Sequence, residues 1–240
     1  MLSDQMAAVL ILLGGDGAER RGSGLVPAAT AAALGVDGIC AGVGTGPEGV
    51  VLAWGGEEIG GALDEAQFTL GEGPSFEAVA GGVPILVPDL AATGARWPAF
   101  TPVAVGLGVG AVFAFPLRIG AISIGVLLAH RAVPGFMEGG QLADALALAD
   151  AVTVLLLHLE PADRVASGDG RTRPRPGWDQ PATHRAQVHQ ATGMLSVQLS
   201  VPLAEALVRL RAHAYATDRP ISEVAADLVA RRLYLEDSTL

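Results

Sequence analysis

The stretch from Thr183 to Leu235 has the sequence THRAQVHQATGMLSVQLSVPLAEALVRLRAHAYATDRPISEVAADLVARRLYL. Apolar residues recur in it every three or four positions, in three separate runs, and this spacing is typical of one buried helical face. Pro202 and Pro220 lie between the runs, where proline suits the first turn of a helix but cannot continue the helix before it. Ser222 is a suitable N-cap for the third run. The stretch therefore predicts three short helices.

Each predicted helix has a single apolar stripe and about four turns or fewer, a length that is marginal for an isolated helix in water. The three helices must therefore pack against one another to bury their stripes. We expect residues 182–236 to form a compact three-helix domain.

Three motifs in this stretch resemble the ANTAR domain, a three-helix RNA-binding output module of bacterial antiterminators. They are QATGML at 190–195, ALVRLRAHA at 206–214 and DRPISEVA at 218–225. The resemblance covers about the last 55 residues. Family members commonly have a lysine between the alanine and glycine of the first motif, and this chain has Thr192 there.

The resemblance implies that the first two helices form an RNA face and that the partner is a stem-loop of a nascent transcript. The residues implied to contact RNA are Arg185, Gln190, Ala191, Thr192, Gly193, Arg209, Arg211 and Arg219. Gly193 inside a helix costs roughly 1 kcal/mol relative to alanine, so it requires a reason. Close helix crossing and close RNA approach are the two alternatives, and we favour helix crossing.

Composition bounds the remaining possibilities. The 240 residues are 50% apolar and 17% charged, which is enough apolar material for a core and too little charge for wholesale disorder. A single cysteine, Cys40, excludes an internal disulfide and a multi-cysteine metal cluster, as expected for a reducing cytosol. The chain contains no lysine, which excludes Walker-type and Schiff-base lysines.

The net charge of −10 is concentrated in the first two thirds of the chain. Residues 1–160 contain 5 arginines and 16 acidic residues, whereas residues 161–240 contain 10 and 9. An acidic body repels nucleic acid, so any phosphate contact must come from a local arginine face in the tail.

The first strands expected in the chain are Val36–Val43 and Gly49–Trp54. The turn between them contains a formal G-x-G-x-x-G pattern at Gly44, Gly46 and Gly49. A dinucleotide site needs a helix to begin there, but an apolar strand-like run follows instead. We therefore expect a hairpin.

Residues 21–159 resemble a GAF domain of the kind fused to ANTAR in actinobacterial regulators. The resemblance is carried by FTLGEGPS at 68–75, VPILVPD at 83–89 and RWPAF at 96–100, followed by two apolar runs at 111–117 and 122–130. The β-branched content of these runs and the short glycine-containing link between them favour an antiparallel hairpin, and Pro84 and Pro88 suggest that the short strand between them lies at an edge. The resemblance implies an α+β chain in which an antiparallel sheet has flanking helices. Ser75 occupies a position where family members often have cysteine.

A GAF-like domain is expected to sense a small molecule or a protein. Aromatic residues are candidates for lining a pocket, or alternatively ordinary core residues: Trp54, Phe68, Trp97, Phe113 and Phe115. The sequence shows no catalytic triad, paired cysteines or metal-binding histidine pair, so we expect no cofactor, no metal and no enzyme activity. Cys40 is expected to be buried filler.

Residues 138–159 are expected to form a long helix that links the sensor to the tail. Its apolar residues cover more than one stripe, which predicts a homodimer through this helix. Residues 160–181 are rich in Pro, Gly and Arg and predict a linker, and residues 1–20 form an N-terminal segment. The segment has a short apolar run preceded by Asp4, unlike a signal peptide.

Asp144 and Asp150 would be costly in lipid, so the long helix is not expected to cross a membrane. The sequence thus predicts a cytoplasmic regulator in which a GAF-like sensor controls RNA binding and transcription antitermination. The alternative is a protein-interaction module whose ANTAR-like tail no longer binds RNA.

Overall fold

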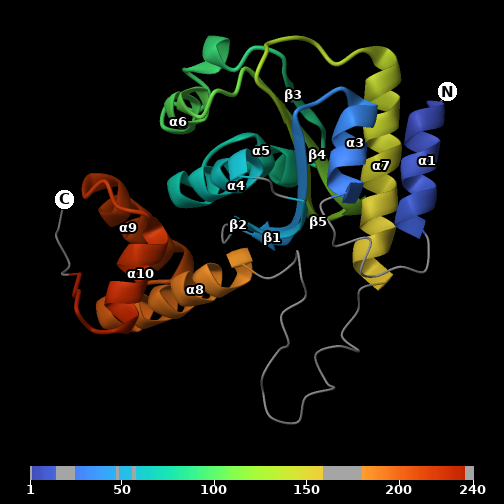
Figure 1. Ribbon diagram of the computed structural model, residues 1–240. Coiled ribbons are helices and arrows are strands. Elements are labelled where there is room, and N and C mark those ends of the chain that lie inside the picture. The colour runs from blue at the N-terminus through green and yellow to red at the C-terminus, as the bar shows by residue number, and fades with distance from the viewer. Residues whose placement is uncertain (1, 15–24, 47–48, 56–57, 159–179, 236–240) are drawn as a thin grey trace.

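The computed structural model describes residues 2–14, 25–46, 49–55, 58–158 and 180–235. These residues form a sheet domain, residues 2–158, and a helical domain, residues 180–235 (Figure 1). The predicted linker, residues 160–181, lies outside the described residues except at its last two positions. The chain is α+β, as predicted.

The sheet has five antiparallel strands in the order β2-β1-β5-β4-β3. Their bounds are β1 Gly38–Gly46, β2 Gly49–Gly55, β3 Ile85–Val87, β4 Ala111–Ile119 and β5 Ile122–Arg131. The predicted hairpin at 111–130 is confirmed and lies inside the sheet, with β1 beyond β5. The short strand between Pro84 and Pro88 lies at the edge, where a proline costs no ladder hydrogen bond.

The G-x-G-x-x-G segment forms a hairpin, as predicted. Gly46 at the end of β1 pairs with Gly49 at the start of β2 in an antiparallel ladder. No helix begins at this turn among the described residues, so it does not form the dinucleotide-binding arrangement.

Both faces of the sheet are apolar and each is covered by helices. Residues of β4 alternate between them, because successive side chains of a strand point to opposite faces. Phe113 and Phe115 pack against α1 Asp4–Gly14, α3 Leu25–Leu34 and α7 Gly139–His158. Val112 and Ala114 pack on the other face, against α4 Glu58–Leu70, α5 Pro74–Gly81 and α6 Phe100–Gly106. Figure 1 shows these two layers on either side of the strands.

The N-terminal segment, predicted as residues 1–20, is not separate from the sensor. Helix α1 buries Met6, Val9 and Leu13 in the same core as α3 and α7. Asp144 of α7 anchors the start of α1, because this buried carboxylate accepts hydrogen bonds from the backbone N–H and the hydroxyl of Ser3. The Ser3 hydroxyl oxygen in turn accepts from the N–H of Met6.

The helical domain has the three predicted helices: α8 Gln180–Leu199, α9 Leu203–Ala216 and α10 Ile221–Val229. The prediction that Ser222 caps the third helix is wrong. Pro220 is the N-cap residue, with the extended ψ of 136°, and Ser222 already lies within the first turn. Since proline fixes its own φ near the helical value, the helix begins directly after it.

By length and composition, helix α7 is long and apolar enough to cross a membrane. The same holds for the bent pair α8 and α9 if the two helices are counted as one span. Three observations place α7 in the sheet domain instead. It packs on the sheet through Leu148, Val152 and Leu155, it lies beside α1, and its Asp144 is bonded to Ser3.

We predict that Asp144→Ala lowers the free energy of unfolding by roughly 1–3 kcal/mol, because Ser3 loses its buried acceptor and the start of α1 is released. Urea unfolding followed by circular dichroism measures the change. Asp150→Ala, which removes an exposed carboxylate from the same helix, is the control and should cost less than about 0.5 kcal/mol. Equal effects of the two substitutions would contradict the anchoring role.

Candidate nucleic-acid interface

Two of the residues implied to contact RNA lie inside the helical domain. Ala191 is fully buried, and Thr192 is 6% exposed with its hydroxyl donating to the Val188 carbonyl at 2.8 Å. Ala191 packs with the apolar stripes of all three helices. In this arrangement Ala191 and Thr192 shape the core of the domain rather than its surface. The side chain of a lysine in place of Thr192 would therefore start from a buried position on the helix.

Gln190 and Gly193 lie on the outer side of α8. Gln190 is exposed, and a Cβ added at Gly193 would meet no atom within 4 Å. The expectation that Gly193 permits a close helix crossing is therefore wrong, since nothing packs there. Arg185 belongs to α8, but its side chain lies outside what the structure describes.

Arg209 and Arg219 are each held by carboxylates of the helical domain. The Arg209 guanidinium donates to Glu205 one turn earlier, at 2.7 Å. Arg219 donates to Asp227 at 2.7 Å and lies 3.7 Å from Glu223. The hydrogen bond from Arg219, followed by that from Arg232, holds the pKa of Asp227 below its usual value. These pairs reduce the positive charge that the domain offers to phosphate.

Arg211 reaches across to the sheet domain. Its Nε donates to the backbone carbonyl of Phe68 in α4 at 2.9 Å. Its guanidinium carbon lies 5.5 Å from the Phe68 ring centroid and 5.7 Å from that of Phe76, within the range of a cation–π contact. Phe68 itself is 2% exposed and belongs to the apolar core of the helical domain. We call this set of contacts the Arg211 dock.

The loop between α4 and α5 is shaped to receive Arg211. Gly71 has a φ of +70°, and a Cβ there would lie 3.1 Å from an Arg211 guanidinium nitrogen. Glu72 accepts hydrogen bonds from the N–H groups of Ala99 and Phe100, which satisfies the start of α6. The Gly-Glu-Gly-Pro motif thus contributes both to the sheet domain and to its contact with the helices.

Arg209 and Arg211 do not share one face of α9. Residues two apart on a helix are about 200° apart around its axis. Val208, Arg211 and Tyr215 follow the three- and four-residue spacing of the side that faces the sheet domain, where they line a shared cavity. The Arg209 side is turned away from it. The expected single arginine face is therefore divided between two sides of the helix.

The five candidate pocket aromatics do not converge. Phe113 and Phe115 are fully buried on the α7 side of the sheet, whereas Trp97 packs on the α4 side against Phe100. Phe68 faces the helical domain, and the side chain of Trp54 lies outside the described residues. The four described side chains therefore belong to three different parts of the core. The position of each residue on its strand or helix directs its side chain away from the others.

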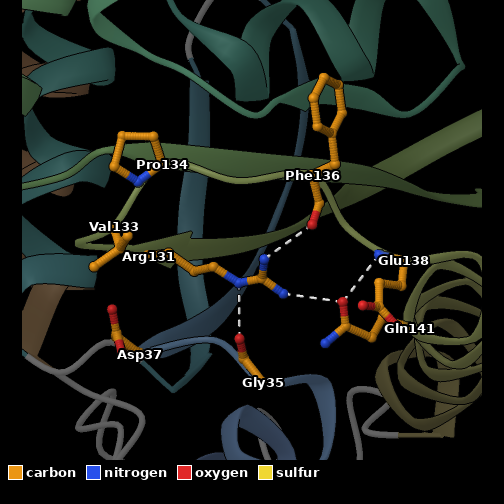
Figure 2. Close-up of a pocket in the computed structure, with 8 residues that line it drawn as sticks. All are labelled: Gly35, Asp37, Arg131, Val133, Pro134, Phe136, Glu138 and Gln141. Atoms are coloured by element: carbon orange, nitrogen blue, oxygen red, sulfur yellow. Dashed lines mark hydrogen bonds between the residues drawn. The ribbon is translucent and has the colours of Figure 1, made fainter.

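The cavity around Arg131, at the end of β5, is lined by a hydrogen-bond network that joins parts of the sheet domain. Figure 2 shows its guanidinium donating to the carbonyls of Gly35 and Phe136 and to the side-chain oxygen of Gln141, at 2.7, 3.2 and 3.1 Å. All three nitrogens are used in this way. Arg131 therefore joins three segments of the sheet domain rather than offering a free cation.

Cys40 lies in β1 and is 3% exposed. Burial, with a smaller contribution from the charge of Asp64, raises the pKa of its thiol well above the ordinary value. The thiol is therefore unreactive, as expected for buried filler. Within the part of the chain that the structure describes, no group of three or more His, Cys, Asp or Glu is arranged to hold a metal ion.

Comparison with known families matches the ANTAR domain to residues 180–229, which is the helical domain. Among solved structures, the sheet domain is similar to the GAF domain from an Acinetobacter phosphoenolpyruvate-protein phosphotransferase. The TM-score is 0.50 at 12% identity, and the match covers 69% of this chain and 96% of that one. The chain joins a GAF-fold domain to an ANTAR domain.

Two further solved structures resemble the GAF domain. The A. aeolicus Nlh2 GAF domain in an inactive state has a TM-score of 0.47 at 16% identity, and covers 65% of this chain and 96% of its own. The GAF domain of a Coxiella burnetii phosphoenolpyruvate-protein phosphotransferase has a TM-score of 0.47 at 18% identity, with the same coverages. No curated protein matches the chain. At 12% identity, the similarity to the Acinetobacter GAF domain shows the fold and not the ligand.

Sequence reasoning did not assign a role in the contact to Gly71 and Phe76, which lie on the GAF side of the Arg211 dock. The glycine-rich loop was visible as a motif, but its neighbour in space was not. Only the folded chain shows that Arg211, 143 positions after Phe68, lies against it.

We predict that Gly193→Ala raises the free energy of unfolding of the ANTAR domain by roughly 1 kcal/mol, because the helix gains propensity and the new methyl group meets open space. Denaturant unfolding of the full chain measures it. The control is Gly125→Ala, whose Cβ would lie 2.0 Å from the Gly42 carbonyl oxygen and which should destabilise. A destabilising Gly193→Ala would contradict the open space around the Cβ position of Gly193.

Proposed function

We propose that this protein is a signal-responsive RNA-binding regulator that acts by transcription antitermination, with the GAF domain controlling the ANTAR domain. The ANTAR match and the sensor-type fold support this role. The proposed RNA face is the outer side of α8 with Gln190 and Gly193, extended by Arg185 and by the arginines of α9. The stem-loop of a nascent transcript is the proposed partner, and the cytoplasm the proposed location.

The observation that carries the proposal is the Arg211 dock. An arginine implied to bind RNA is instead hydrogen-bonded to the Phe68 carbonyl of the GAF domain. RNA and the GAF domain therefore compete for the same guanidinium. In this docked arrangement the protein is held back from RNA through Arg211, and separation of the domains makes that side chain available.

The strength of the dock suits a reversible control. A hydrogen bond from a charged donor contributes roughly 1.5–3 kcal/mol. A cation–π contact adds roughly 0.5–2 kcal/mol. Each 1.4 kcal/mol is about a factor of ten in an equilibrium constant. A signal with a modest preference for the separated state is then sufficient to shift the population.

We predict opposite effects of substitutions on the two sides of the dock. Phe68→Ala weakens docking and leaves the ANTAR side chains intact, so RNA affinity of the full chain should rise by about tenfold or more. Arg211→Ala also undocks the domains but removes the proposed phosphate contact, so RNA affinity should fall. Filter binding to paired stem-loops over a range of salt concentrations measures both.

Two controls accompany this comparison. Phe76→Leu removes only a ring beneath Arg211 and should give a smaller gain than Phe68→Ala. Arg96→Ala removes an arginine that pairs with Glu77 within the GAF domain and should leave RNA affinity unchanged. If Arg211→Ala instead raises affinity as much as Phe68→Ala, Arg211 is a docking residue only. If neither the parent chain nor any variant retains RNA, the protein-interaction alternative is favoured.

We further propose that the protein is a homodimer through α1 and α7. The two helices lie side by side on the face of the sheet opposite α4 and α5 (Figure 1). Their outer sides expose apolar side chains: Leu2, Ile11 and Leu12 of the α1 region, and Leu146, Val154 and Leu157 of α7. A second copy of the same pair would cover this face as a four-helix bundle. The ANTAR domain lies on the other side of the sheet and therefore does not cover this face.

We predict that Leu146→Glu combined with Val154→Glu yields a monomer, because two carboxylates would be buried against their symmetry mates. Light scattering after gel filtration should give twice the 24.3 kDa chain mass for the parent and one chain mass for the variant. Ile122→Glu, which changes a more exposed apolar residue at the β4–β5 turn, should remain dimeric. A monomeric parent protein would contradict this interface.

A further inference from the structure

A cavity of about 670 Å³ lies between the two domains. Its walls come from α4, from the start of α6, and from the end of α9 with the loop that follows. A second cavity of about 340 Å³ shares Leu70 and Tyr215 with it and extends toward Arg211. The space is therefore continuous with the Arg211 dock and exists only while the domains are docked.

The size and walls of this cavity are those of a small-molecule site. Pockets that bind small ligands measure about 300–1,000 Å³ and are mostly apolar, with a few polar groups. Leu70, Val103 and Tyr215 supply apolar and aromatic surface. Val103 is 44% exposed and Tyr215 is 69% exposed, so apolar surface on both domains faces solvent at one opening. A ligand that spans the opening would remove that surface from water.

The charges on the walls select the kind of ligand. Glu65 of the GAF domain and Asp218 of the ANTAR domain both line the cavity. Arg219, which also lines the cavity, is already paired with Asp227 and Glu223. Two carboxylates from different domains thus line the same space, and no ion pair within the described residues involves either of them. Like charges on the two domains oppose docking, and a bound cation would remove the opposition.

We propose that the interdomain cavity binds a small organic cation with a flat apolar body, such as an aromatic amine or amidine. The ring packs on Tyr215, Leu70 and Val103, and the cationic group lies between Glu65 and Asp218. Because both domains contribute to the site, the ligand binds the docked arrangement and stabilises it. By linkage, the ligand and RNA then weaken each other's binding, a consequence that rests on the proposed function.

The test uses the full chain and three probes that share an indole ring: tryptamine as the cation, 3-methylindole as the neutral form and indole-3-acetate as the anion. Calorimetric titration should show tryptamine binding most tightly and indole-3-acetate least. Asp218→Asn should weaken tryptamine binding by about tenfold, the effect of losing one charge-assisted contact. Asp218 has a φ of +50°, a conformation that asparagine also adopts, so the fold is retained.

Glu65→Gln should weaken tryptamine binding in the same way, whereas Glu58→Gln should not, because Glu58 lies on α4 outside the cavity. No tryptamine binding at millimolar concentration, equal binding of the three probes, or unchanged binding to Asp218→Asn and Glu65→Gln would overturn the proposal.

This titration contains no RNA, so its outcome is independent of whether the ANTAR domain binds RNA. A separate measurement tests the consequence: tryptamine should lower RNA affinity of the parent chain and have no effect on that of Phe68→Ala. Retained tryptamine binding without any RNA binding would contradict the proposed function and leave the ligand site standing.

Discussion

The hydrogen bond from Arg211 to the Phe68 carbonyl fixes how the ANTAR domain lies on the GAF domain. Phe68 is near the end of α4, and its side chain belongs to the apolar core formed by α8, α9 and α10. One residue of the sensor is thus part of the core of the output domain, and one arginine of the output domain is paired with the sensor. Neither side can change position without breaking this contact.

The position of the dock organises the rest of the molecule. Helices α4, α5 and α6 cover one face of the sheet, whereas α1, α3 and α7 cover the other face. The ANTAR domain contacts α4 through α9 and contacts β2 through α8. The proposed dimer face and the output domain therefore lie on opposite sides of one sheet, as Figure 1 shows. A change of packing at α4 would reach Arg211 directly. The interdomain cavity adjoins the same helix, so a ligand there would act on the dock without a long path through the fold.

Much of the fold followed from local patterns. Two apolar runs with β-branched residues, joined by a short glycine-containing link, predicted the β4–β5 hairpin, and the two prolines around β3 indicated an edge strand. Helical spacing predicted α7 and the three helices of the ANTAR domain. The failures were of two kinds. The cap assigned to Ser222 failed because Pro220 begins the helix by itself. The helix crossing assigned to Gly193 failed because open space surrounds that position.

The sequence by itself determined the two domains, their helices and strands, and the residue types available to each, because periodicity, turn residues and motifs are local properties of the chain. The tertiary structure alone decided which of those residues meet. It directed Phe113 and Phe115 away from Trp97, brought Arg211 to Phe68, and enclosed a cavity between Glu65 and Asp218. Contacts between residues so far apart in the chain depend on how whole helices pack, and no local pattern encodes that packing.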